Sequence, residues 1–433
     1  KVHFWLENLR ELSATLANRQ IPLVIETVPT FDAVPKTLCD VAQRTGCDAL
    51  YFNHEYEVNE QARDEATEAL FEKHDLAVYT FHDRVVLPPA GIEKNDGGFY
   101  SVFTPYSRVW KDRVSDDDMH LLQLPPKQKQ IAVTASKVPD NVDGYDFPSP
   151  RDDLWPAGEA AAKRRLRYFV DNQLDDYHQR RDIPSVGGTS LLSPYLAAGV
   201  LSPRQCLSAA VDANRGRISG GKKGADTWIT ELIWREFYTH VLVGFPRVCK
   251  HRPFQQYTDK IAWRDADEDF NAWQEGRTGY PIVDAAMRQL ARTGWMHNRL
   301  RMVAAMFLTK HLLVDWRRGE RHFMRHLVDG DLAANNGGWQ WSASTGTDAA
   351  PYFRIFNPYS QCKKFDAEGK FIKKFCPELE PLRADALHDP EKLAAALSEH
   401  EIDYPAPIVE HGAARQRAIQ AFKAVKSRDE PNA

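Results

Sequence analysis

The chain has 433 residues, 43% hydrophobic and 27% charged, with a net charge of −4. This composition describes a soluble globular protein, and the length predicts two domains. No apolar run is long enough to span a bilayer, and no signal peptide precedes the first helical segment. The six scattered cysteines include no CxxC pair. We therefore expect a cytoplasmic, reducing environment and no metal site.

Charge is distributed unevenly along the chain. Residues 1–155 carry 16 basic and 26 acidic side chains, a net charge of −10. Residues 160–330 carry 27 basic and 18 acidic side chains, a net charge of +9. This asymmetry predicts a surface that meets a polyanion. A solvated helical surface explains the same counts equally well.

Residues 1–114 predict an α/β domain. Apolar spacing favours helices at 3–19, 35–46 and 57–74, and strands at 22–28, 49–53 and 76–81. Strands connected through helices form a parallel sheet. Residues 115–155 are rich in Pro, Asp and Lys and predict an interdomain linker.

Residues 156–433 predict a larger all-α domain, because no convincing strand pattern occurs there. The candidate helices span residues 157–180, 203–213, 225–243, 266–275, 281–292, 296–313 and 319–328.

The stretch 329–341 reads DGDLAANNGGWQW and predicts a loop, since its apolar content is too low for a core helix. Asp329 and Asp331 flank a glycine, as in a tight turn. One interpretation is an irregular loop whose tryptophans pack into the core. The other is a cofactor loop, in which Gly337 and Gly338 let a flat ligand approach the backbone.

Two further segments combine polar and aromatic residues. In 187–205, Thr189, Ser190 and Ser193 could hold a phosphate at the start of a helix, or could simply cap that helix. In 227–242, one helical face carries a carboxylate and an arginine among aromatic rings, which suggests either a structural ion pair or a functional site. The residues of that face are Trp228, Glu231, Arg235 and Tyr238.

Three long strings resemble the photolyase and cryptochrome family: 278–290 (TGYPIVDAAMRQL), 298–317 (NRLRMVAAMFLTKHLLVDWR) and 329–358 (DGDLAANNGGWQWSASTGTDAAPYFRIFNP). The resemblance covers the helical domain and most of the α/β domain, and it is strongest to bacterial class I cyclobutane pyrimidine dimer photolyases. It implies light-driven repair of pyrimidine dimers in UV-damaged DNA by a monomer that holds FAD, active in its reduced form. Base flipping by photolyases is an established case.

The resemblance also implies roles for particular residues. It places FAD against Tyr177, Thr189, Ser190, Leu191, Leu192, Ser193, Trp228, Arg235, Arg301, Asp329, Asp331 and Asn335, with Arg301 paired to Asp329 and Asn335 at the flavin N5. It places the lesion against Glu231, Trp234, Asn298, Met302 and Trp341. It implies an electron relay through Trp339, Trp316 and Trp263. DNA contacts would come from Arg181, Glu231, Trp234, Arg299 and Gln361.

An antenna chromophore is also implied. Folate-binding relatives use an Asn-Glu pair and a Cys-Lys pair, which correspond here to Asn59 with Glu60 and Cys249 with Lys250. These residues favour 5,10-methenyltetrahydrofolate, with a deazaflavin as the alternative. Relatives begin with a strand some tens of residues before Lys1, so we expect the Rossmann-like sheet to lack its first strand.

Two other functions are compatible with the family. One is a blue-light photoreceptor, although many such receptors have long C-terminal tails, whereas this chain ends soon after the helical domain. The other is repair of the (6-4) photoproduct. That activity is disfavoured, because those relatives carry histidines at the positions of Asn298 and Met302.

Overall fold

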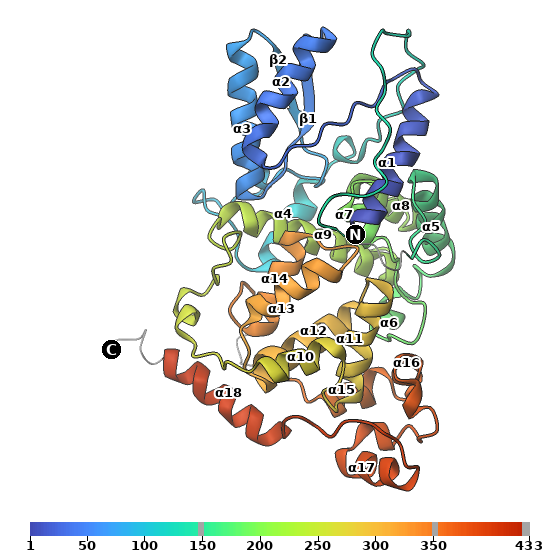
Figure 1. Cartoon of the computed structure of the whole chain (residues 1–433), viewed down its shortest axis with the longest axis vertical. Helices are drawn as coiled ribbons and strands as arrows, with labels where there is room; N and C mark the ends of the chain where they lie inside the picture. Colours follow the sequence, from blue (N-terminus) through green and yellow to red (C-terminus); the bar gives the residue numbers. More distant parts are fainter. Residues whose placement is uncertain (146–150, 349–353, 427–433) are drawn as a thin grey trace. The chain divides into compact units, whose positions relative to one another are not determined.

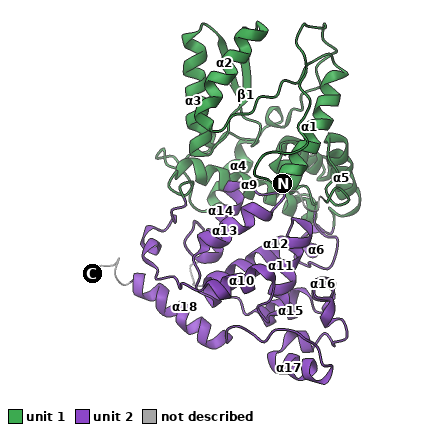
Figure 2. Cartoon of the chain, in the orientation of Figure 1, with its two compact units in different colours: residues 1–175, 190–250 green, residues 176–189, 251–433 purple. Residues whose placement is uncertain are grey.

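The computed structural model describes residues 1–145, 151–348 and 354–426, which divide into two compact units (Figures 1 and 2). Unit 1 comprises Lys1–Asp175 and Ser190–Lys250. Unit 2 comprises Asp176–Thr189 and His251–Ala433. These bounds differ from the predicted divisions at residues 114 and 155, which stay a prediction. Residues 146–150 of the predicted linker lie outside the described residues.

Unit 1 contains the predicted parallel sheet, in two strands. β1 (Ala49–Asn53) pairs in parallel with β2 (Ala77–Phe81), and α3 (Val58–Lys73) connects them. α2 (Val34–Thr45) and α3 pack together and cover one sheet face through Cys39, Ala42 and Phe71 (Figure 1). A parallel pair needs such a crossover, because a short turn cannot bring the second strand back to the same direction.

The strand predicted at 22–28 is wrong. This segment has no regular structure among the described residues of unit 1. Its backbone bonds to Ser136 and not to a strand: Ser136 N donates to Leu23 O at 2.8 Å, and Ile25 N donates to Ser136 Oγ at 3.0 Å. The apolar pattern of a segment indicates only that the segment favours an extended conformation. A strand also needs a paired neighbour, which no local pattern supplies.

The longest helix of unit 1 is α9 (Lys223–Gly244), which packs against α4 and α8. Glu236 of α9 is fully buried, and its carboxylate accepts from Trp110 Nε1 at 2.7 Å and from Leu87 N at 3.3 Å. Burial raises the pKa of Glu236. The other helices are α1 (Val2–Ala17), α4 (Phe103–Arg113), α5 (Glu159–Asn172), α7 (Ser193–Ala197) and α8 (Pro203–Ala213).

The described residues of unit 2 form helices and connecting loops without a strand, as predicted, and its apolar core includes residues of α10 to α14. At the centre, Asp284 accepts from Thr278 Oγ1 at 2.6 Å and from Tyr404 OH at 2.5 Å. The helices are α6 (Tyr177–Arg180), α10 (Asp267–Glu275), α11 (Pro281–Thr293), α12 (Asn298–Met306), α13 (Trp316–His326), α14 (Leu332–Ala343), α15 (Pro358–Phe365), α16 (Lys370–Phe375), α17 (Pro390–Glu399) and α18 (His411–Lys426).

Two helices predicted as continuous are interrupted. The helix expected at 157–180 ends at Asn172 in α5, and Tyr177 starts the separate α6. The helix expected at 296–313 consists of α12 followed by a π-helical turn, Phe307–His311. Across the described residues, no helix is both long enough and apolar enough to cross a bilayer.

Candidate functional site

The loop predicted at 329–341 is wrong from residue 332 onward, because α14 starts there. Asp331 caps the helix, and its carboxylate accepts from Ala334 N at 3.0 Å. Of the predicted loop, only residues 329–331, which precede α14, lie outside the helix. Low apolar content misled the sequence argument, since α14 buries polar residues that have hydrogen-bond partners. Asn336 and Gln340, for example, are 3% and 2% exposed and bond to each other.

Helical geometry separates the two tryptophans of this stretch. Residues two apart on a helix point roughly 200° apart, so Trp339 and Trp341 face opposite sides of α14. Trp339 is buried and packs edge-on against Phe323 and Trp273, with ring centroids 4.9 and 6.0 Å away. Trp341 is only half-buried.

Gly319 of α13 leaves the space that Trp339 occupies. A Cβ atom at Gly319 would lie 2.1 Å from the indole of Trp339 and 2.6 Å from Leu308 Cδ2. At Gly338 of α14, by contrast, a Cβ atom would meet nothing within 4 Å. Glycine is therefore required at 319 by close packing and not at 338.

We expect Gly319→Ala to lower the free energy of unfolding by about 1–3 kcal/mol, because the added methyl group overpacks the core. Gly338→Ala is the matched control. It should be neutral or stabilising by roughly 0.5–1 kcal/mol, since alanine favours the helix. Urea titration followed by tryptophan fluorescence measures both. Equal stability of the two variants would contradict the packing argument.

Asp329 and Arg301 form the predicted ion pair. Arg301 Nη2 donates to Asp329 Oδ2 at 2.8 Å, and Arg301 Nε donates to Met296 O at 2.8 Å. The side chain of Asp329 is 2% exposed, whereas that of Arg301 is 26% exposed. The second carboxylate oxygen, Asp329 Oδ1, is buried without a partner. A buried acceptor with no donor fits a site that completes itself with a ligand.

Asn335 lies one turn into α14 and is 9% exposed. Its Nδ2 donates to the backbone carbonyl of Glu320 at 3.1 Å. The amide nitrogen is thus engaged, and the carbonyl oxygen is left to accept from another donor. Asn335 was predicted from the sequence, but Glu320 was not; its carboxylate is buried in unit 2 beside α14. A lone glutamate in a helix gave no signal.

α12 carries Asn298 and Met302 four residues apart, on one helical face. His297 precedes them, and its Nδ1 accepts from Arg299 N at 3.2 Å; burial lowers the pKa of His297 to about 4. Arg299 pairs with Asp182 at 2.9 Å and lies over the ring of Phe365.

Elsewhere in unit 2, Tyr177 is buried, and Arg181 lies over its ring at 5.5 Å. Thr189 is half-buried and ends the short segment of unit 2 that begins at Asp176. Gln361 lies on α15, and its Oε1 is buried without a partner.

The three tryptophans predicted to form an electron relay differ in exposure. Trp316, the first residue of α13, is 1% exposed, and Arg317 lies over its ring. Trp263 is half-buried and packs edge-on against Phe422 of α18. Trp316 and Trp339 are thus more deeply buried than Trp263, and their part in an electron relay stays a prediction.

In unit 1, α9 carries four of the predicted residues. Trp228 is buried against Phe169, with ring centroids 4.8 Å apart. Trp234 is half-buried and stacks on Phe103 at 3.7 Å. The remaining two, Glu231 and Arg235, are half-buried, and Arg235 donates to the backbone carbonyl of Arg84.

The Ser190–Ser193 segment enters α7 without the predicted serine cap. Leu192 holds the capping position, and α7 has no side-chain cap. Leu191 has a φ of 53°, in the left-handed region that non-glycine residues rarely adopt. Leu192 N donates to Ser190 Oγ at 3.4 Å.

The two segments predicted to bind the antenna come together in unit 1. Val58 N, next to Asn59, donates to Cys249 Sγ at 3.4 Å. Burial is the largest cause that raises the pKa values of both Glu60 and Cys249. Lys250 follows Cys249 directly. Residues almost 200 apart in the sequence are thus neighbours, as the resemblance implies.

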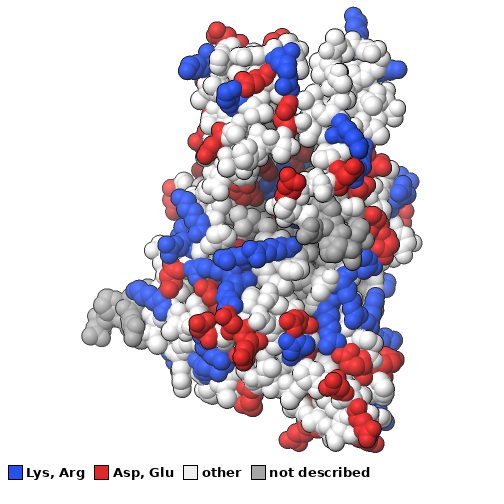
Figure 3. All heavy atoms as spheres, viewed as in Figure 1, with Lys and Arg blue, Asp and Glu red and all other residues white. Residues whose placement is uncertain are grey.

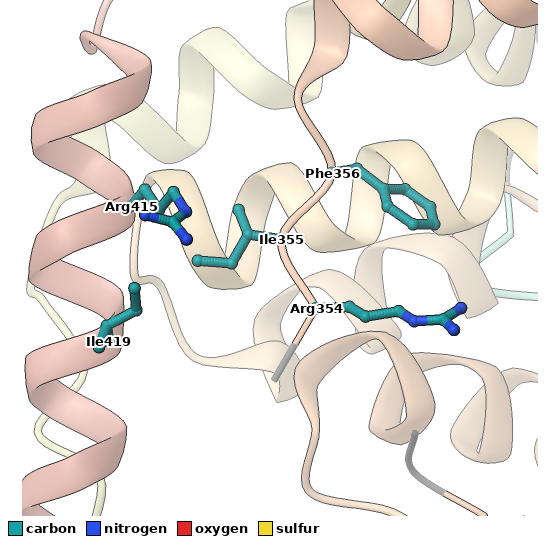
Figure 4. Close-up of a pocket in the computed structure, with 5 residues that line it drawn as sticks. All are labelled: Arg354, Ile355, Phe356, Arg415 and Ile419. Carbon is teal, nitrogen blue, oxygen red and sulfur yellow. The ribbon is translucent and has the colours of Figure 1, made fainter. Parts of the chain in front are cut away.

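A pocket in unit 2 involves none of the predicted site residues. It is lined by Arg354, Ile355 and Phe356 and by two residues of α18, Arg415 and Ile419. Figure 4 shows Ile355 pointing toward α18. Both arginines are exposed, and the pocket is open to solvent. We assign it no part in the site.

Comparison with known proteins shows which family this chain belongs to. A family model described as the FAD binding domain of DNA photolyase matches residues 228–424, and one described as DNA photolyase matches residues 1–128. The deoxyribodipyrimidine photo-lyase of Escherichia coli is 46% identical over 96% of this chain and 87% of its own length. That of Vibrio cholerae is 42% identical over 96% and 88%. The chain belongs to the DNA photolyase family.

Solved structures agree with this assignment. A crystal structure of a bacterial class III photolyase from Agrobacterium tumefaciens has a TM-score of 0.88 and 36% identity, covering 98% of this chain and 89% of that one. An archaeal photolyase from Sulfolobus tokodaii with two FAD molecules has a TM-score of 0.75 and 30% identity, covering 98% and 88%.

Proposed function

We propose that this protein is a deoxyribodipyrimidine photo-lyase, which repairs cyclobutane pyrimidine dimers in DNA with light. The observation that carries the proposal is the 46% identity to the Escherichia coli enzyme over 96% of the chain. The bound cofactor is FAD, which in its reduced, excited form supplies the electron that splits the dimer. The protein binds the cofactor and lesion, orients them and excludes water.

The geometry of unit 2 fits reduced FAD. A reduced flavin carries a hydrogen on N5, so it needs an acceptor there. Because Asn335 Nδ2 is engaged by Glu320 O, the amide presents its carbonyl oxygen. Asp329 Oδ1, buried and without a partner, is a second acceptor for a polar group of the cofactor. The remaining cofactor residues are those that the resemblance implies, Tyr177, Thr189–Ser193, Trp228, Arg235, Arg301 and Asp331.

We propose that the protein acts as a monomer in the cytoplasm and that its partner is damaged DNA. Figure 3 shows several groups of Lys and Arg side chains, with groups of Asp and Glu side chains beside them. Basic groups of this kind bind backbone phosphates without reading sequence. Trp234, Trp341, Asn298 and Met302 are the proposed walls of the lesion pocket, and Arg181, Arg299 and Gln361 the proposed contacts to the flanking strand.

Glu231→Ala tests the lesion site. We propose that Glu231 hydrogen-bonds the edge of the flipped bases, so this variant should repair dimer-containing oligonucleotides at least roughly tenfold more slowly, the loss expected for one charged hydrogen bond. It should keep its FAD. Repair is measured as light-dependent loss of dimers, with flavin content read from absorbance. Glu268→Ala, at an exposed position of α10, is the control. Release of FAD by Glu231→Ala would assign Glu231 a structural role instead.

For the antenna we propose 5,10-methenyltetrahydrofolate, bound in the Rossmann-like unit 1 by Asn59, Glu60, Cys249 and Lys250. The alternatives are a deazaflavin and a second flavin, since the archaeal relative holds two FAD molecules. The absorption spectrum of the purified protein distinguishes them. Cys249→Ala should remove the antenna band and leave the flavin bands unchanged. Loss of both sets of bands would contradict separate sites.

A further inference from the structure

A buried hydrogen-bond network in unit 2 connects the surface to the helix that carries Asn335. Glu320 of α13 is at its centre, with a side chain only 2% exposed. Glu320 Oε1 accepts from Asn336 Nδ2 at 2.8 Å. Glu320 Oε2 faces His251 Nδ1 at 3.1 Å. A buried carboxylate is costly unless it is paired, so both contacts matter.

The network extends along α14 and back to the segment that contains His251. Gln340 Nε2 donates to Asn336 Oδ1 at 2.8 Å and to Arg252 O at 3.2 Å. Gln340 Oε1 accepts from Phe254 N at 2.8 Å. Three contacts therefore attach residues 251–254 to the buried side of α13 and α14. Fully bonded networks of this kind are rigid.

Glu320 reaches Asn335 through its backbone. The carbonyl of Glu320 is the acceptor that holds Asn335 Nδ2. The side chain of the same residue holds Asn336, the next residue of α14. A shift of Glu320 would thus disturb both asparagines together and rotate the amide of Asn335.

His251 is the exposed end of the network. Its side chain is 62% exposed, and its φ is 54°, a left-handed conformation that costs energy in a non-glycine residue. The hydrogen bond that His251 Nδ1 donates to the Glu320 carboxylate is the largest cause that raises the pKa of His251 above its ordinary 6.5. Two arginines of α13, Arg321 and Arg317, oppose this by repulsion, and Arg317 Nε also donates to the His251 carbonyl.

We propose that His251 is a positioning residue for the flavin: its protonated ring fixes Glu320, and Glu320 fixes the amide of Asn335. This inference rests on the proposed function. Protonated His251 neutralises the buried carboxylate and keeps the network closed. Loss of the proton leaves the buried Glu320 carboxylate facing a neutral ring, without the cation that compensates its charge.

The direction of the pH effect follows from the raised pKa. The attraction between the protonated His251 ring and the Glu320 carboxylate is fully present below the ordinary histidine pKa of 6.5. It is lost as the pH rises through the raised pKa of His251. In that range the preference of the site for reduced over oxidised FAD should fall. A tenfold loss corresponds to about 30 mV in the midpoint potential of a two-electron couple.

The first experiment follows the pKa of His251 directly in the full-length protein, by NMR of carbon-13-labelled histidine, with His251→Asn to assign the signal. Asparagine tolerates a left-handed backbone, so the variant should fold. We expect the pKa of His251 to fall toward 6.5 in Glu320→Gln. An unchanged pKa in that variant would overturn the proposal.

The second experiment measures the midpoint potential of bound FAD between about pH 5 and about pH 9, the range in which a histidine titrates. His251→Lys, with a constant charge, should remove the step that the wild type shows. His251→Asn should have a lower potential than the wild type at acidic pH and the same potential as the wild type at alkaline pH. His400→Asn, at an exposed position after α17, is the control. Identical profiles in all variants would overturn the proposal. Failure to bind FAD or to repair DNA would instead count against the proposed function, and the NMR result would still stand.

Discussion

Arg301→Ala should lower the free energy of unfolding by about 3–5 kcal/mol, because it leaves a buried carboxylate without its charged partner. Asp329, at 2% side-chain exposure, has no access to water that could replace Arg301. Asp329→Asn should cost less, roughly 1–2 kcal/mol, since Arg301 is 26% exposed and keeps its bond to Met296 O. The two halves of one ion pair are thus predicted to differ.

Asp329→Asn, which should be the milder of the two variants for stability, should still have a large effect on FAD binding. Asp329→Asn removes a charged acceptor that we propose for FAD, and it should weaken FAD binding by at least roughly tenfold, the effect of one charge-assisted hydrogen bond. Denaturant titration and flavin release measure the two effects. Lys370→Ala, which breaks an exposed pair with Glu368, is the stability control and should leave the free energy of unfolding nearly unchanged, because water solvates both side chains. If Arg301→Ala unfolds no more easily than Lys370→Ala, the argument from burial is wrong.

The second large effect concerns the two tryptophans of α14. Trp339→Phe should abolish most light-driven reduction of oxidised FAD, because we propose that Trp339 passes electrons to it. It should leave repair intact once the flavin is reduced chemically. Trp341→Ala should leave the light-driven reduction of FAD intact and should impair repair. It should weaken binding of dimer-containing DNA by roughly 1–3 kcal/mol, the cost of losing one aromatic stacking partner.

Stability separates this division of roles from simple damage to the core. Trp339 is 2% exposed, so Trp339→Phe should also lower the free energy of unfolding by about 1–3 kcal/mol through the cavity it creates. Trp273→Phe creates a comparable cavity beside Trp339 and serves as the matched control. Trp341→Phe should have little effect on stability. If Trp273→Phe impairs photoreduction as strongly as Trp339→Phe, core disruption and not the proposed relay explains the loss.

Periodicity predicted β1, β2, α2 and α3 closely, since these elements contact one another within a short stretch of chain. It failed at 22–28, where the segment is apolar and extended but no strand pairs with it in the described structure. It failed again at 332–343, where burial is satisfied by hydrogen bonds rather than by apolar side chains. Both errors have one cause: the deciding partner is distant in the sequence.

By itself the sequence determined the α/β and helical organisation, the family, and the identity of most proposed site residues, because long strings of side chains carry that information locally. Tertiary structure alone decided what surrounds those residues. It paired Asp329 with Arg301 and left Oδ1 buried without a donor, oriented the Asn335 amide through Glu320 O, and placed Trp339 over Gly319. The stretch 329–341 contains several of the residues that we propose for the site, and its side chains bond to Glu320 of α13 and to Arg252. Such contacts depend on distances between segments that no local pattern contains.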